Sequence, residues 1–163
     1  MNTKFISSLA VAALLVGSTL SAAELSRADR QFFEKAAKSG HKEVTVSSTV
    51  LPKLTVPAAR EFAEMMVADH TKAGEELKAL ASRKGVTLPA PEQKFAEKWR
   101  DNDKNVDHDY LKEMVDDHQE AIELFEKASK SEDADIAAFA QKTLPTLRHH
   151  LEQAKMHEKV KTH

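Results

Sequence analysis

The sequence predicts an all-α protein: an antiparallel four-helix bundle made of two helical hairpins, with a short connector helix between them. Apolar residues recur every three or four positions along most of the chain, which is the spacing of one helix face. Glycine is scarce, with four in 163 residues, so few helix-weakening positions interrupt this pattern. Four long amphipathic segments, paired by short turns, favour a bundle.

The first predicted hairpin consists of two long helices. One begins at Ser26, a favourable N-cap residue, and ends at Pro52. Its stretch 44–50 is rich in β-branched residues and therefore has the weakest helical signal. The other begins near Pro57, where proline suits the first helical turn, and ends at Gly85.

The second predicted hairpin follows a longer connection over residues 86–102, which carries a short helix near 92–100. One long helix then runs from about 104 to 128, and the last begins near Asp133 and runs into the C-terminal region. The connection is long enough to cross the whole bundle, so the sequence leaves the order of the helices open.

The first 23 residues have the composition of a secretory signal. Lys4 gives a short basic start, an apolar stretch fills 5–20, and small residues occupy 21–23. We therefore expect cleavage after Ala23, a single helical domain over 24–163, and a periplasmic location. Neither this stretch nor any later one has the length and apolar character of a membrane anchor.

Charge and cysteine content exclude several classes of function. The formal net charge is −2 and both signs are mixed along the chain, so nucleic acid is not a predicted partner. The chain has no cysteine, which excludes disulfides, thiolate metal sites and CxxCH haem attachment. No hydrolase or transferase motif is present, so no catalytic residue is predicted. A second copy of the chain and an envelope protein both stay open as partners.

Two of the predicted helices share an internal repeat. Residues 66–73 read MVADHTKA and residues 114–121 read MVDDHQEA, with five of eight positions identical. Both repeats place a histidine, His70 or His118, within the apolar stripe of the helix. A shared local role explains this match better than chance similarity of two amphipathic helices.

Each of the four long helices carries one metal-competent side chain on its apolar stripe or at the edge of it: Glu43, His70, His118 and His150. Burying a carboxylate and imidazoles costs free energy unless they are paired or bound to a metal. These residues are therefore candidate ligands for iron, zinc or copper, which this ligand chemistry does not distinguish. A Glu43–His70 hydrogen bond, with a matching pair in the other hairpin, is the alternative.

Four residues beside the histidines are secondary candidates. Asp69 and Asp117 directly precede the two repeat histidines and can orient imidazoles as hydrogen-bond acceptors, or be ordinary surface acids. Met66 and Met114 lie four residues before the same histidines. A thioether beside an imidazole suits copper or a haem iron, although methionine at a core position is more often a filler.

A set of residues spread over nearly all of the mature chain carries a family resemblance: Asp29, Phe32, Phe33, Ala36, Ala37, Gly40, Glu43, Val44, Phe62, Ala63, Met66, Val67, Asp69, His70, Leu77, Leu80, Ala81, 85–89, Asp107, Tyr110, His118, Phe139, Ala140, 144–147, His150 and Leu151. With these residues the chain resembles a family of bacterial exported proteins of unknown function with a ferritin-like fold, often labelled predicted outer membrane proteins. The resemblance implies a ferritin-like bundle and no established activity.

The chain departs from the ferritin-like di-iron proteins in its motifs. Those proteins use Glu-x-x-His on two helices, and this sequence contains no Glu-x-x-His. A ferroxidase or oxygenase centre is therefore not predicted. The sequence also lacks the alternating ten-residue strands of an outer-membrane barrel.

Three functions from different classes remain. The first is a periplasmic metal-binding bundle. The second is a non-enzymatic helical module that supports envelope stress tolerance by binding proteins, which predicts a self-paired core and an exposed apolar patch. The third is a redox or haem protein that uses the Met/His pairs, which predicts a coloured protein.

Overall fold

The structure of the protein is a computed structural model that describes residues 24–101 and 103–159. The predicted signal segment and its cleavage position after Ala23 lie outside the described residues. Within those ranges the protein is all-helical, with five α-helices, one 3-10 turn and no strand. None of the described helices is long and apolar enough to cross a membrane.

The helices follow one another as α1 (Arg27–Val50), the 3-10 turn η1 (Leu51–Lys53), α2 (Pro57–Arg83), α3 (Lys94–Arg100), α4 (Val106–Ala128) and α5 (Ala134–Glu158). The all-helical prediction is therefore confirmed, and the short connector helix is α3. The β-branched stretch near the end of α1 is helical throughout, because the burial of Val46 and Val50 in the core outweighs their weak intrinsic helix preference.

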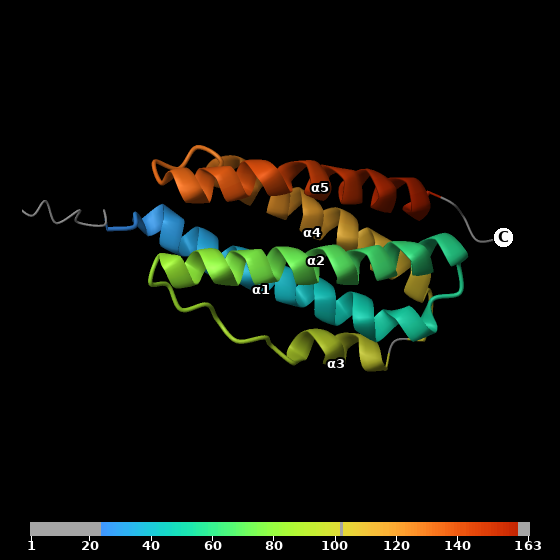
Figure 1. Cartoon of the computed structure of the whole chain (residues 1–163). Coiled ribbons are helices and arrows are strands. Elements are labelled where there is room, and N and C mark those ends of the chain that lie inside the picture. The colour runs from blue at the N-terminus through green and yellow to red at the C-terminus, as the bar shows by residue number, and fades with distance from the viewer. Residues whose placement is uncertain (1–23, 102, 160–163) are drawn as a thin grey trace, which may run out of the picture.

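Figure 1 shows α1 and α2 as antiparallel neighbours, and α4 and α5 as a second antiparallel pair. In addition, α1 packs against α4, and α2 packs against α5. The connection after α2 returns along the length of the molecule, with α3 lying against α1. As a result α2 and α4 run parallel to each other, while each pair of neighbouring long helices is antiparallel.

Two clusters of buried side chains fill the interior. One is built around Phe32, Phe33 and Phe125, and the ring centroids of Phe32 and Phe125 lie 5.1 Å apart in an edge-on contact. The other is built around Trp99 and Tyr110. Between these clusters, along each long helix, lie four buried polar side chains: Glu43, His70, His118 and His150.

Asp107, in the first turn of α4, ties that helix to the start of α2. Its carboxylate accepts hydrogen bonds from the main-chain N–H groups of Thr55 at 3.0 Å and Val56 at 2.9 Å, and from the Thr55 hydroxyl at 2.8 Å. Val56 is the N-cap residue of α2 and has no capping side chain of its own. Asp107 therefore binds, from another helix, the amide groups of the two residues that directly precede α2 and so anchors the start of that helix.

Replacing Asp107 with alanine is expected to lower the free energy of unfolding by about 2 kcal/mol, because hydrogen bonds to a charged acceptor are lost. Asp107→Asn keeps one acceptor oxygen and should lose less. Urea unfolding followed by circular dichroism measures both changes. Asp109→Ala, in the same turn but exposed, is the matched control and should change stability by less than about 0.5 kcal/mol. Equal losses at the two positions would contradict this role.

Candidate metal centre

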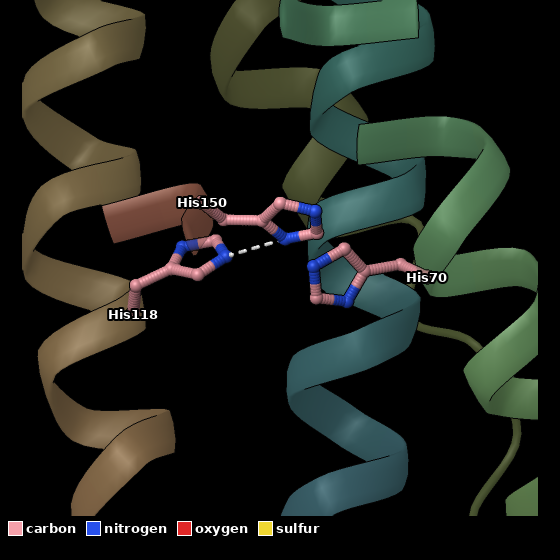
Figure 2. Close-up of side chains that lie close together, drawn as sticks. All are labelled: His70, His118 and His150. Atoms are coloured by element: carbon pink, nitrogen blue, oxygen red, sulfur yellow. Dashed lines mark hydrogen bonds between the residues drawn. The ribbon is translucent and has the colours of Figure 1, made fainter. Parts of the chain in front are cut away.

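Three imidazoles converge between the two core clusters. His70 comes from α2, His118 from α4 and His150 from α5, and Figure 2 shows their rings turned toward one another. One possible ligand atom from each residue lies within 4.8 Å of the other two. All three side chains are buried, with exposed fractions of 7%, 0% and 1%. The helices therefore bring together three of the four side chains that the sequence singles out.

Glu43, the fourth of these side chains, lies beside His70 instead of joining the group. Its Oε2 is 2.7 Å from His70 Nδ1, and its Oε1 is 3.8 Å from His118 Nδ1. The carboxyl is 1% exposed. In this position Glu43 fixes the ring of His70, a candidate ligand, through the nitrogen that faces away from the other histidines.

The outer hydrogen bonds of His118 and His150 determine which ring nitrogens face inward with a lone pair. His118 Nδ1 lies 2.8 Å from the main-chain oxygen of Met114, so that N–H donates to the carbonyl. His150 Nε2 lies 2.9 Å from Asp69 Oδ2 and donates to that carboxylate. The remaining nitrogens, His118 Nε2 and His150 Nδ1, are 3.3 Å apart. In the neutral rings both carry lone pairs, which repel unless a proton or a cation lies between them.

His70 supplies the third inward nitrogen. Because Nδ1 donates to Glu43, its Nε2 is directed at the other two rings, and this buried atom has no hydrogen-bond partner. Tetrahedral coordination at metal–nitrogen distances of about 2.0–2.1 Å requires nitrogens about 3.3 Å apart. The observed His118–His150 distance of 3.3 Å already meets this requirement.

The pKa values of the three imidazoles are shifted in different directions. Burial lowers the pKa of His118 and lowers the pKa of His150 to about 4, so both rings are neutral at neutral pH. Burial also acts to lower the pKa of His70, but the adjacent Glu43 carboxylate outweighs it and raises that pKa. The same contact lowers the pKa of Glu43, so the two shifts favour a protonated His70 beside an ionised Glu43. A metal would displace the proton on His70 Nε2.

Comparison with known sequences places the chain in a family. Residues 15–156 match the profile of DUF4142, a domain of unknown function. The chain belongs to the DUF4142 family. A search of curated proteins finds no sequence that matches this DUF4142 chain.

Comparison with solved structures finds a likeness to the crystal structure of a DUF305 fragment from Deinococcus radiodurans. The TM-score is 0.70 at 13% sequence identity, over 80% of the DUF4142 chain and 95% of the other chain. At so low an identity the likeness shows a shared helical fold and carries no information on activity.

The charges around the DUF4142 triad balance a divalent cation. Glu43 and Asp69 contribute two negative charges, each through a carboxylate that contacts a histidine ring. A dication bound by three neutral imidazoles would therefore leave the site without net charge. This balance offsets much of the free-energy cost of burying an ion.

The two aspartates of the internal repeat have different partners. Asp69 contacts His150, whereas both carboxylate oxygens of Asp117 lie 2.7 Å from Lys42 Nζ. Burial raises the pKa of Asp117 to about 6, against the opposing effect of Lys42. Asp69 therefore orients an imidazole, and Asp117 forms an ion pair between α4 and α1 in the DUF4142 structure.

The two repeat methionines are buried in the core cluster around Trp99 and Tyr110. Both Met66 and Met114 have exposed fractions of 0%. Met114 contributes to the triad through its main-chain oxygen, which accepts from His118. This placement is the one expected for methionine as a core filler.

Proposed function

We propose that this protein binds a transition-metal ion through His70, His118 and His150. The observation that carries the proposal is the pairing of each ring with an outer acceptor, which leaves three buried nitrogens within 4.8 Å of one another. Metal-binding histidines typically donate their second N–H to a carboxylate or a carbonyl in this way. All three histidines here have such a partner.

Zinc is the ion we favour among iron, zinc and copper. Neutral imidazole suits all three ions, but the 3.3 Å spacing of two of the nitrogens fits tetrahedral coordination. Three protein ligands leave the fourth position for water or an added molecule. Structural zinc sites in proteins usually have four protein ligands, so this site belongs to the open type.

The proposal includes a ferritin-like four-helix bundle as the scaffold. Its support is the topology, in which two antiparallel hairpins are joined by one long crossover connection. The ligand set differs from that of di-iron ferritin-like proteins, because the chain has no Glu-x-x-His motif. We therefore propose a single-ion histidine site.

A self-paired polar core explains part of the geometry. The two pairs that this alternative requires, Glu43 with His70 and His118 with His150, are both close contacts. However, His70 Nε2 stays buried without a partner. An unsatisfied buried polar atom costs about 1–3 kcal/mol, so pairing alone leaves a penalty that a bound ion removes.

A protein-binding module has less support. That function predicts an exposed apolar patch. Across the part of the chain that the structure describes, the exposed large hydrophobic side chain is Met156, which is 51% exposed. A single exposed methionine does not form a patch, so we place metal binding first.

Export to the periplasm is also part of the proposal, and it rests on the composition of residues 1–23. Elemental analysis together with the intact mass of untagged protein recovered from the periplasm tests both parts. We expect Glu24 as the first residue and about one metal ion per chain. The His70→Ala/His118→Ala double variant should carry none.

Two results would contradict the proposal. The first is protein that stays metal-free after incubation with zinc, copper and iron. The second is a Soret band in the absorption spectrum of the purified protein, which would favour the haem alternative with Met66 and Met114. Recovery of uncleaved protein in the cytoplasm would contradict export alone.

A further inference from the structure

An interior cavity of about 800 Å³ borders the triad. His70, His150 and Glu43 lie on its wall, and residues 86–89 of the segment that follows α2 also line it. Most of the remaining wall is apolar and includes Leu77, Phe125, Phe139 and Leu147. Small-molecule sites in proteins are typically mostly apolar, about 300–1,000 Å³ in volume, and carry a few convergent polar groups.

Two glycines within helices lie on the wall of this cavity. Gly40 in α1 and Gly74 in α2 both line it, and a Cβ added at either position would meet no atom within 4 Å. Neither glycine has a positive φ, in contrast to Gly85. Close packing and backbone strain therefore do not account for them. Glycine inside a helix costs about 0.5–1 kcal/mol of stability relative to alanine. What the two glycines provide in return is free space beside the helix backbone, where a larger side chain would otherwise lie.

We propose that the cavity binds a small amphipathic molecule with one anionic head group and an apolar body. The head would occupy the open coordination position of the triad metal, and the body would lie along the apolar wall toward Phe125 and Phe139. The head-group contact rests on the proposed metal site, whereas the apolar contact depends on the cavity alone. The combination of the histidines of the triad with a mostly apolar wall favours this class of ligand.

A series of straight-chain carboxylates from acetate to octanoate provides the test. Cobalt(II)-loaded protein reports head-group coordination through its visible spectrum, and calorimetry gives each affinity. Burial of one methylene contributes about 0.8 kcal/mol, so affinity should rise about fourfold per added methylene until the cavity is full. The cobalt bands should shift with each acid that binds.

The Gly40→Leu/Gly74→Leu double variant fills the space and should still take up cobalt. Its affinity for octanoate should fall to that for acetate. Ala68→Leu, which adds the same side chain to the exposed face of α2, is the matched control and should behave as the wild type. Circular dichroism verifies that both variants are folded.

The outcomes separate the two proposals. Protein that binds cobalt but shows equal affinity for acetate and octanoate would overturn this inference and leave the metal site standing. An undiminished chain-length dependence in the double leucine variant would also overturn it. Protein that takes up no cobalt would overturn the proposed function, while chain-length dependence in that same protein would still support the cavity.

Discussion

Replacing His150 with alanine is expected to weaken zinc binding by more than about 100-fold, whereas replacing its neighbour His149 should leave zinc binding unchanged. The two histidines are adjacent on α5, but His150 is buried in the triad and His149 is exposed. Loss of an outer partner of a ligand typically reduces metal affinity by about 10- to 100-fold. Loss of the ligand itself should therefore reduce affinity further.

Competition with a colorimetric zinc chelator measures this difference in affinity. Asp69→Asn is a variant with an expected intermediate effect, because it weakens the hydrogen bond to His150 Nε2 and keeps all three imidazoles. Its zinc affinity should lie between those of the wild type and His150→Ala. If His149→Ala and His150→Ala lose affinity equally, zinc binds at the surface and the triad is not the site.

The metal-free protein should lose about 3 kcal/mol of stability from His150 alone as the pH falls from about 6.5 to about 4. Burial lowers the pKa of this histidine to about 4 in the folded state. In the unfolded chain its pKa is about 6.5, so the unfolded state takes up the proton first. The stabilisation is therefore complete above about pH 6.5 and is lost as the pH falls through this window.

The groups that face His150 set the size of this effect. Asp69 from α2 opposes the shift through its hydrogen bond, while His70 and His118 increase it. Urea unfolding of the apo-protein between about pH 7 and about pH 4 gives the stability profile. His150→Gln removes this titration and should show a shallower decline. Identical slopes for the two proteins would contradict the neutral buried state of His150.

Helical periodicity was sufficient to predict the elements of the fold. The long helices α1, α2, α4 and α5 begin and end close to the residues that capping and proline signals indicate, such as Ser26 for α1. Helix position is a local property, since the apolar face recurs every three to four residues. The direction of the crossover connection was left open, because it depends on contacts between distant helices.

The same periodicity placed Glu43, His70, His118 and His150 on inward faces, and all four are buried. Periodicity did not distinguish the candidate ligands from the residue that hydrogen-bonds to one of them. Whether a carboxylate enters the group or supports an imidazole depends on side-chain rotation and on the few ångströms between helix axes. Spacing along one helix does not contain that information.

The different roles of Asp69 and Asp117 were also beyond the sequence pattern. Both precede a repeat histidine, but they contact different helices. Asp69 contacts His150 on α5, and Asp117 contacts Lys42 on α1. A signal for this difference exists in hindsight, because the helix opposite Asp117 carries a lysine next to its inward Glu43. The sequence did not predict the cavity, because Gly40 and Gly74 differ from their neighbours in sequence only as weak helix formers.

Anomalous diffraction from crystals of the protein loaded with one equivalent of zinc tests the central claim most directly. The expected result is a single peak at about 2.0–2.1 Å from His70 Nε2, His118 Nε2 and His150 Nδ1, with Glu43 and Asp69 still contacting the outer nitrogens. A peak at exposed histidines such as His108 or His149, with the triad empty, would contradict it.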